Sequence, residues 1–219
     1  MKIIKPYYEI LTSIDGIKEL QQIEVAARVC YKSEEHIKED GESAKKLVAM
    51  LIKSGHEAML EHSQLSVKFI VDRGVSHEIV RHRLFSFAQE SQRYCAYNKD
   101  KFGNEVTFIK PLFYRPEDDN WDKMQEYDWG IDWYRACKTA EESYFRMLAN
   151  GASPQMARSV LPNSTKTEIV VTGNYREWRN FFKLRVDKAA HPQMREVTIP
   201  LLKELQSKIP IIFDDITPT

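Results

Sequence analysis

Apolar residues recur every three or four positions along much of the chain, which is the spacing of a helix with one buried face. Residues that favour helix ends flank several of these stretches. Asp15 can cap the first, Gly55 ends the second, and Ser153 with Pro154 begins a later one. Asn174, with Glu177 three residues later, resembles a capping box for another. The pattern predicts helices over residues 15–30, 43–53, 76–83, 121–150, 153–161, 174–184 and from 192 onward. The last helix contains Pro200, which is expected to kink or split it.

Strand patterns are fewer. Alternating apolar positions predict a strand over residues 66–72 that ends at Arg73. Shorter extended segments are expected over 106–109 and 168–172, the second followed by a turn at Gly173. No internal repeat, low-complexity tract or linker divides the chain. We therefore predict one α+β domain that covers all 219 residues, 1–219, with several helices and few strands.

Composition and charge narrow the class of protein. The chain holds 42% hydrophobic residues, and its 32 basic side chains balance 32 acidic ones. Without a net field, attraction to nucleic acid or to an anionic membrane is not expected. No segment has the length and apolar character of a secretion signal or a membrane span, so we expect a cytoplasmic protein. Three scattered cysteines without a Cys-x-x-Cys pair agree with a reducing compartment.

The densest polar cluster covers residues 81–94, where three arginines, a histidine, two serines and two glutamines alternate with aromatic side chains. Arginine offers forked donors that suit phosphate, and aromatic rings offer flat faces for a ring system. A nucleotide or flavin site would use such a set. An amphipathic surface helix explains the same residues, because Arg83, Ser86, Glu90 and Arg93 fall on one broad helical face. The residue chemistry alone does not decide between a ligand site and a surface helix.

The order and spacing of the residues in this segment resemble those of a known family. It reads Arg-His-Arg, two residues, Ser, four residues, Ser, one residue, Arg-Tyr, which resembles the signature of the flavin-dependent thymidylate synthases. Further stretches resemble the same family in the same order, at residues 26–30, 55–62, 157–162 and 174–185. The resemblance therefore covers most of the chain.

The resemblance implies a reaction and an assembly. This family converts dUMP to dTMP, with a carbon from 5,10-methylenetetrahydrofolate and reducing equivalents that NADPH delivers through bound FAD. It works as a homotetramer with shared active sites and needs no cysteine nucleophile, so Cys95 is expected to be a spectator. The implied fold has several helices around a small, mostly antiparallel sheet and no Rossmann motif. Consistently, the chain contains no Gly-x-Gly-x-x-Gly or Walker loop, so side chains must hold the flavin pyrophosphate.

The resemblance also implies site residues. The positions expected to bind dUMP are Glu78, Arg81, Gln89, Glu90, Ser91, Gln92, Arg93, Arg158 and Arg185. The positions expected to bind FAD are Ala58, Arg81, His82, Arg83, Gln89, Asn174, Arg176, Asn180 and His191. Arg185 is the expected catalytic residue. Its permanent positive charge beside the uracil ring would stabilise negative charge on N3 and O4 and so make C5 nucleophilic.

Five positions depart from residues that relatives often carry: Cys30, Ala58, Glu78, Ala88 and Gln89. A glutamine can still bond a ribose hydroxyl through its carbonyl oxygen, and an alanine still offers its backbone groups. We interpret these departures as tolerated variation.

Two other site readings and two other functional classes remain. His56 and His62 do not stand at the i, i+4 spacing of a zincin, so we predict a polar helix-to-strand connection and no metal site. The aromatic group of Trp121, Trp129, Trp133 and Tyr134 is expected in a core or subunit interface.

A single-strand nucleic-acid module would use the arginines and aromatics of residues 81–97, and a catalytically dead structural relative would lack turnover.

Overall fold

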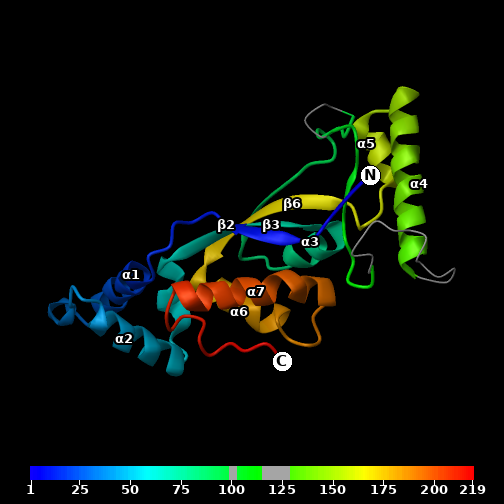
Figure 1. The fold of residues 1–219 in the computed structure, drawn as a ribbon. Coiled ribbons are helices and arrows are strands. Elements are labelled where there is room, and N and C mark those ends of the chain that lie inside the picture. Colours follow the sequence, from blue (N-terminus) through cyan, green and yellow to red (C-terminus); the bar gives the residue numbers. More distant parts are fainter. Residues whose placement is uncertain (99–102, 115–128) are drawn as a thin grey trace. The chain divides into compact units, whose positions relative to one another are not determined.

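The computed structural model describes residues 1–98, 103–114 and 129–219 (Figure 1). Its strands are β1 (Lys2–Ile4), β2 (Tyr7–Ile10), β3 (Gln64–Asp72), β4 (Ser86–Gln89), β5 (Thr107–Ile109) and β6 (Lys166–Asn174). Its α-helices are α1 (Gly16–Val29), α2 (Glu42–Lys53), α3 (Arg73–Ile79), α4 (Trp129–Ala149), α5 (Pro154–Ala157), α6 (Tyr175–Arg185) and α7 (Pro192–Lys208). Short 3-10 helices are η1 (Glu34–His36), η2 (Glu57–His62) and η5 (Arg158–Val160). The predicted α+β class is confirmed.

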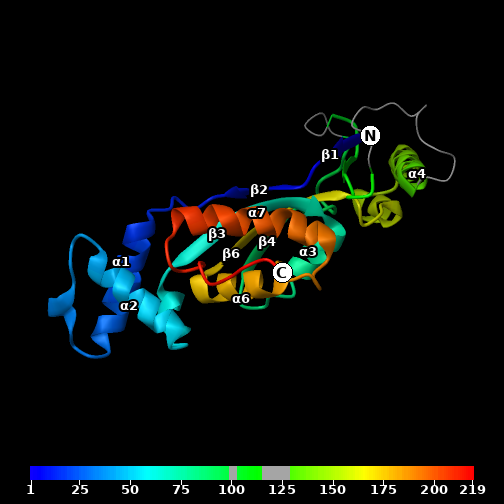
Figure 2. The same cartoon turned by 60° about the horizontal axis from the view of Figure 1, so that its bottom comes forward.

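A four-stranded sheet has the order β2-β3-β6-β4 (Figure 2). The backbone N–H of Tyr175 donates to Ser63 at one end of the β3–β6 pair, and that of Arg73 donates to Asn163 at the other. From Ser63, just before β3, to Arg73, just after it, the bonded residue beside β6 moves backward from Tyr175 to Asn163, so the two strands are antiparallel. The expected small, mostly antiparallel sheet is thus confirmed. Strands β1 and β5 form a separate parallel pair.

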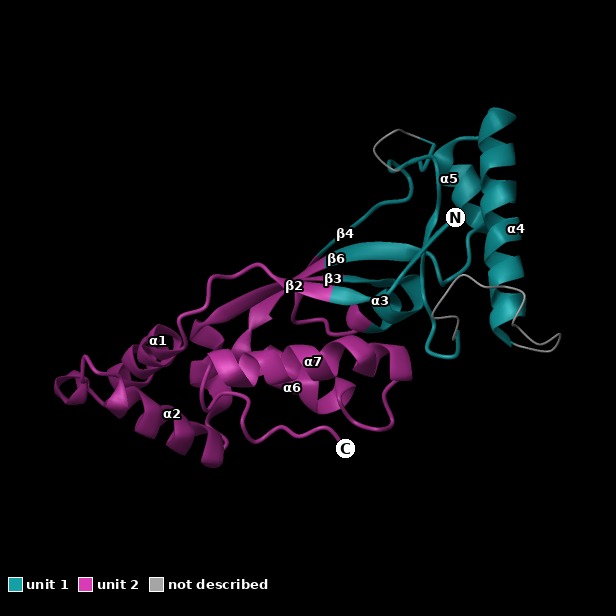
Figure 3. Ribbon diagram, in the orientation of Figure 1, with its two compact units in different colours: residues 1–7, 70–78, 88–169 teal, residues 8–69, 79–87, 170–219 magenta. Residues whose placement is uncertain are grey.

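The described chain separates into two compact units (Figure 3). Unit 1 contains residues 1–7, 70–78 and 88–169, and unit 2 contains residues 8–69, 79–87 and 170–219. Strands β3, β4 and β6 each contribute residues to both units. The single domain expected over residues 1–219 stays a prediction. Among the described residues, no helix combines the length and the apolar composition needed to span a bilayer.

Local signals located most helix ends correctly. Asp15 caps α1 by accepting a hydrogen bond from the backbone N–H of Lys18 at 3.3 Å. Ser153 caps α5 in the same way, and Pro154 is its first residue. Pro200 lies inside α7, which stays one helix. The helix predicted over 76–83 instead begins at Arg73 and ends at Ile79. It begins earlier because the Asp72 carboxylate accepts the N–H of Val75 at 2.7 Å and so starts the helix directly after β3.

Two expectations about the middle and end of the sheet are wrong. The amphipathic helix considered for residues 81–94 is absent, because Ser86–Gln89 form strand β4 beside β6. The turn expected at Gly173 is also absent, since β6 continues to Asn174. Strands β1 and β2 were not predicted, and their three and four residues are too short to show a clear alternation.

Aromatic packing beneath α6 forms the core of unit 2. Trp178, Phe181 and Phe182 are fully buried on this helix. The Trp178 ring lies 4.7 Å from the ring of Phe85, and the Phe182 ring lies 5.5 Å from that of Phe213. Burying such rings is worth roughly 1.5–3 kcal/mol each. The same packing therefore fixes both α6 and the segment of residues 79–87.

Unit 1 has its own core around α4. Cys137 and Tyr144 are buried there against Phe108 and Val106. Burial raises the pKa of the Cys137 thiol to about 12, which agrees with the expected packing role for this helix. Trp133 packs against this core and its indole N–H donates to Ser164 Oγ at 2.9 Å. Trp129 is exposed, and residues 121–128 of the predicted helix, including Trp121, lie outside the described residues.

The close approach of Gly173 to Phe85 predicts a steric effect on stability. A Cβ at position 173 would lie 2.1 Å from Phe85 Cδ1. We expect Gly173→Ala to lower the free energy of unfolding by about 1–3 kcal/mol, as measured by urea denaturation. When Phe85→Leu is already present, adding Gly173→Ala should lower the free energy of unfolding much less than it does in wild type, because the ring that clashes with the new Cβ is gone. A double variant that loses the full sum of both single effects would contradict the steric explanation.

Candidate active site

The residues that the resemblance singles out divide between the units. Unit 1 holds most positions expected to bind dUMP: Glu78, Gln89, Glu90, Ser91, Gln92, Arg93 and Arg158. Unit 2 holds most positions expected to bind FAD, together with the expected catalytic residue: Ala58, Arg81, His82, Arg83, Asn174, Arg176, Asn180, His191 and Arg185.

The beginning of α6 presents several polar side chains to one pocket of unit 2. Asn174 caps the helix by accepting the backbone N–H of Glu177 at 2.9 Å, as the sequence predicted. The pocket has a volume of about 530 Å³. Its lining residues are Glu57, Glu61, Leu84, Asn174, Arg176, Glu177, Asn180 and Lys183. Leu84, which directly follows the Arg-His-Arg segment, lines the same pocket as α6.

Cations and carboxylates alternate around this pocket. Arg176 forms an ion pair with Glu61 at 2.5 Å, and Lys183 Nζ lies 3.5 Å from Glu57 Oε1. Arg176 and Lys183 are half exposed, so these pairs contribute little to stability and can exchange partners. Amide and guanidinium donors beside a pocket of this size fit a polar ring system with an attached phosphate.

His82 lies at the centre of a buried contact between the Arg-His-Arg segment and α6. Its Nε2 accepts a hydrogen bond from Arg185 Nε at 2.9 Å, and its Nδ1 lies 3.4 Å from Glu177 Oε1. Its ring also meets that of Phe181 edge to face at 4.9 Å. Burial, together with the charge of Arg185, lowers the pKa of His82 to about 4. The imidazole is therefore neutral at physiological pH.

In unit 1, Gln89 ends β4 and Glu90 directly follows it, and side chains of neighbouring elements hold both. Gln89 Nε2 donates to Ser76 Oγ at 2.9 Å and to Thr167 Oγ1 at 3.2 Å. Glu90 accepts from Lys166 Nζ at 3.1 Å, and Lys166 also pairs with Glu168 at 2.6 Å. Burial lowers the pKa of Lys166, but its contacts with Glu168 and Glu90 outweigh this effect and raise the pKa overall. Lys166 is thus a cation that fixes the Glu90 carboxylate.

Arg93 and Arg158 are brought to the same element of unit 1. Arg93 Nε donates to the side-chain oxygen of Gln155, which lies on α5, at 3.0 Å. Arg158 directly follows α5 and begins η5. Ser91 precedes Arg93 in a turn in which the backbone N–H of Tyr94 donates to the Ser91 carbonyl. Two arginines and a serine hydroxyl supply the donors that a phosphate needs.

Other expected site residues have different surroundings. Arg81 and Arg83 are exposed, Glu78 is half-buried on α3, and Gln92 is buried. His191 caps α7, where its Nδ1 accepts the backbone N–H of Gln193 at 3.2 Å. The His191 side chain thus caps a helix and is also exposed to solvent.

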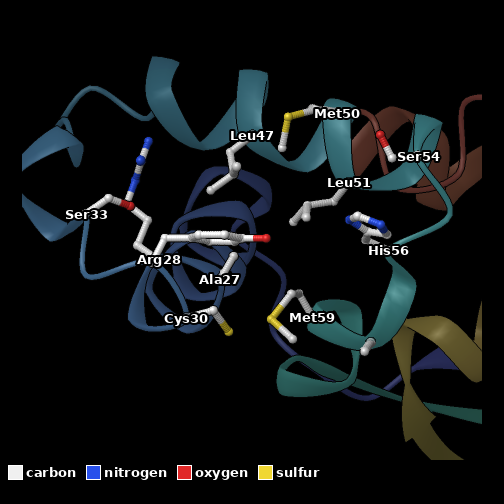
Figure 4. A pocket seen from close by; sticks show the side chains of 12 residues that line it. Ala27, Arg28, Cys30, Ser33, Leu47, Met50, Leu51, Ser54, His56 and Met59 are labelled. Carbon is white, nitrogen blue, oxygen red and sulfur yellow. The ribbon is translucent and has the colours of Figure 1, made fainter.

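Ala58 lines a different pocket of unit 2, of about 500 Å³, between α1, α2 and η2 (Figure 4). Leu47, Leu51 and Met59 form apolar walls there, and His56 lies at one side. In the structure His56 directly precedes η2 and His62 is its last residue; η2 joins α2 to β3, so the predicted polar helix-to-strand connection is confirmed. The described residues contain no group of three or more His, Cys, Asp or Glu side chains placed to hold a metal ion.

Three residues that contact the expected site were not predicted as site residues. Glu177 was recognised only for its place in the α6 capping pattern, and Lys166 and Gln155 were not recognised at all. The spacing from Asn174 to Glu177 locates the carboxylate in the first turn of α6. The contact of Glu177 with His82, 95 positions earlier, has no local sequence signal.

Comparison with solved structures defines the class of fold. The chain resembles a crystal structure of the UMP/dUMP methylase PolB from Streptomyces cacaoi bound with 5-Br dUMP, with a TM-score of 0.77. The match covers 98% of this chain and 96% of that chain at 23% identity. A second structure of the same methylase, bound with 5-Br UMP, matches with a TM-score of 0.72. The fold is therefore that of these methylases.

Sequence comparison then gives the family. Residues 14–211 match the family model described as thymidylate synthase complementing protein. A flavin-dependent thymidylate synthase of Corynebacterium aurimucosum is 35% identical over 201 residues, 88% of this chain and 78% of that protein. One of Mycobacterium avium is 33% identical, over 93% of this chain and 81% of that protein. The chain belongs to the flavin-dependent thymidylate synthase family, which confirms the resemblance seen in residues 81–94.

The buried neutral His82 predicts a pH dependence of stability. Its pKa is about 4 in the folded protein and 6.5 ordinarily, so in this window the unfolded chain binds a proton that the folded chain does not. Stability contributed by neutral His82 is present above the ordinary value and is lost as the pH falls toward the folded value. We expect this group to cost about 2 kcal/mol between pH 7 and pH 5.

Urea denaturation at the two pH values measures this effect. His82→Gln should flatten the pH dependence by that amount, even though the raised pKa of buried Glu177 contributes a slope of opposite sign in both proteins. His36 is exposed, so His36→Gln should leave the pH dependence unchanged. Equal slopes in wild type and His82→Gln would show that folding does not lower the pKa of His82.

Proposed function

We propose that this protein catalyses the reductive methylation of dUMP to dTMP. The carbon donor is 5,10-methylenetetrahydrofolate, and NADPH is the reductant that acts through bound FAD. Family membership supports this reaction. The observation that carries it is the pocket lined by Asn174, Arg176 and Asn180, whose lining residue Glu177 contacts the buried His82–Arg185 pair.

Side chains, not a glycine-rich loop, hold the flavin. Asn174, Arg176 and Asn180 bind it from α6, and Arg81 and Arg83 supply positive charge for its pyrophosphate. When bound, FAD supplies hydride transfer from NADPH to the substrate carbon. Ala58 and His191 contribute flavin contacts from η2 and from the start of α7.

The nucleotide is held mainly by residues of unit 1. Ser91, Arg93 and Arg158 bind the phosphate of dUMP, with the Arg93 side chain oriented by Gln155. Gln89, Glu90 and Gln92 line the sugar and base, and Glu78 and Arg81 add contacts. Lys166 fixes the Glu90 carboxylate in the orientation that the substrate meets.

Arg185 supplies electrostatic catalysis. A guanidinium stays charged at any pH at which the protein folds, so it stabilises negative charge on N3 and O4 of uracil without a proton transfer. His82 accepts from Nε of Arg185, which orients the plane of the guanidinium. C5 of the uracil then acts as the nucleophile, and no cysteine thiolate is required.

The family also supports an assembly and a setting. The proposal includes a homotetramer with shared active sites, a cytoplasmic location and small-molecule partners, namely dUMP, folate and NADPH. The balanced charge of the chain supports the absence of a nucleic-acid partner. Affinity for a nucleic acid would fall steeply with added salt, whereas binding of one mononucleotide would fall much less.

The flavin spectrum tests the proposed reaction. Purified protein is incubated with FAD and desalted, and its visible absorption is followed as NADPH is added without oxygen. We expect retained flavin that bleaches faster with dUMP present, followed by formation of dTMP when methylenetetrahydrofolate is added. Protein that retains no flavin and forms no dTMP would refute the proposal.

Arg185→Ala separates catalysis from cofactor binding in the same experiment. Loss of the charge beside the uracil should reduce turnover by about 10²-fold or more, because such charge stabilisation is a large part of catalysis. Retained flavin should stay comparable to wild type, since FAD is held by other residues. Unchanged turnover would remove Arg185 from the catalytic role.

The phosphate site predicts a selective loss of nucleotide affinity. Arg93→Ala and Arg158→Ala should each weaken dUMP binding by about 10- to 100-fold, the effect of losing a hydrogen bond to a charged group. Isothermal titration calorimetry with dUMP measures this loss. Arg146→Ala removes the same charge from an exposed side chain that bonds Ser143, and it should leave dUMP affinity unchanged. Deoxyuridine, which lacks the phosphate, should bind wild type and both site variants alike.

A further inference from the structure

His82 is enclosed between two charged side chains of α6. Arg185 approaches Nε2 of the ring, Glu177 approaches Nδ1, and both His82 and Glu177 are 5% exposed. The other neighbours of the ring are the aromatic side chains of Phe181 at 4.9 Å and Phe85 at 6.0 Å. The two ring nitrogens therefore meet groups of opposite charge in a nearly dry environment.

The donors and acceptors determine where the proton of the ring lies. A guanidinium offers only donors, so the Nε2 atom that accepts from Arg185 Nε carries no proton. A neutral imidazole has one N–H, which must then be on Nδ1. That N–H is directed to the side that holds the Glu177 carboxylate, 3.4 Å away. The opposite tautomer would place two donors against each other at 2.9 Å.

We propose that Glu177 is a positioning residue: it fixes the Nδ1–H tautomer of His82, which keeps Nε2 as the acceptor that orients Arg185. The effect on turnover rests on the proposed function, in which the Arg185 guanidinium faces the uracil ring. The tautomer itself is a property of the protein without any substrate.

Glu177 is held in place well enough to act in this way. Its backbone N–H bonds the Asn174 cap, which fixes it in the first turn of α6. Asn180 Nδ2 lies 3.4–3.5 Å from its two carboxylate oxygens. Burial raises the pKa of Glu177, and the contact with Asn180 opposes that rise. Glu177 thus contacts the helix cap through its backbone N–H, and the pocket-lining Asn180 and His82 through its carboxylate.

Nitrogen NMR of histidine-labelled protein reads the tautomer directly. The full-length protein with bound FAD is labelled with ¹⁵N at histidine, and His82→Asn identifies the His82 signals by their loss. Long-range proton–nitrogen correlations distinguish a ring protonated on Nδ1 from one protonated on Nε2. We expect wild type to show a neutral ring with the proton on Nδ1 at neutral pH.

Two substitutions of Glu177 test its role. Glu177→Gln keeps an oxygen acceptor, so we expect the Nδ1–H tautomer and turnover within about threefold of wild type. Glu177→Leu keeps the bulk but no acceptor, so the proton should redistribute to Nε2. Turnover at saturating FAD and dUMP should then fall by about tenfold or more, because Arg185 loses its acceptor. Glu204 lies on α7, where its carboxylate accepts a hydrogen bond from the Tyr8 hydroxyl. Glu204→Gln removes this carboxylate and should change neither the tautomer nor turnover.

Arg185→Ala shows which neighbour sets the tautomer. If Glu177 sets it, the Nδ1–H form persists when Arg185 is removed. A mixture of tautomers in Arg185→Ala would show that Arg185 sets it and would overturn the proposal. This arm also decides the matter if Glu177→Leu fails to fold, as judged by circular dichroism.

The remaining outcomes are equally decisive. A wild-type ring protonated on Nε2 or on both nitrogens overturns the proposal, as does a folded Glu177→Leu variant with an unchanged tautomer. Failure of the proposed function is seen separately, as absence of dTMP formation in wild type with the Nδ1–H tautomer intact. The two hypotheses therefore fail by different measurements.

Discussion

A buried guanidinium beneath α6 is the constraint on which unit 2 depends. Arg179 is 1% exposed, and its donors bond Glu57, Asp215 and the backbone carbonyl of Ile212. Asp215 accepts from two nitrogens at 2.6 and 2.8 Å, a forked arrangement that suits arginine. Burial lowers the pKa of Arg179, and its contacts with Asp215 and Glu57 outweigh that effect. Removing one partner would leave a buried charge unpaired, which typically costs about 3–5 kcal/mol.

This ion-pair network determines how α6 can serve a site. Because Arg179, Trp178 and Phe182 must all be buried, the rotation of the helix about its axis is fixed. Arg176 and Asn180 then lie on the opposite side, where they line the pocket. Glu57 joins the two roles, since it pairs with Arg179 and also lines that pocket. The stability of unit 2 and the lining of this pocket thus depend on the same helix.

Local chemistry explains which parts of the fold were predictable. Caps such as Asp15, Ser153 and Asn174 act within a few residues, so the sequence shows them directly. Strand β4 depends instead on pairing with β6, about 80 positions later, and its residues also fit a helical face. In such a segment the sheet partner decides the structure, and periodicity alone does not show that partner.

The candidate site shows the same division. The family signature at residues 81–94 gave the residue types, and the pocket that gathers Asn174, Arg176 and Asn180 is visible only in three dimensions. No local sequence pattern predicts the contact of Glu177 with His82, because the two residues are far apart along the chain.

In the proposed function separate side chains hold the flavin, which has a consequence for variation. A glycine-rich loop binds pyrophosphate through backbone groups whose geometry fails as a whole, whereas amides and guanidiniums on α6 contribute individually. Replacement at a position such as Ala58 or Gln89 then removes one contact and leaves the others. The role proposed for Arg185 has no such substitute, because it needs a permanent charge in one orientation beside the uracil ring. The side chains that orient Arg185 are therefore under a stricter geometric requirement than those that bind the cofactor.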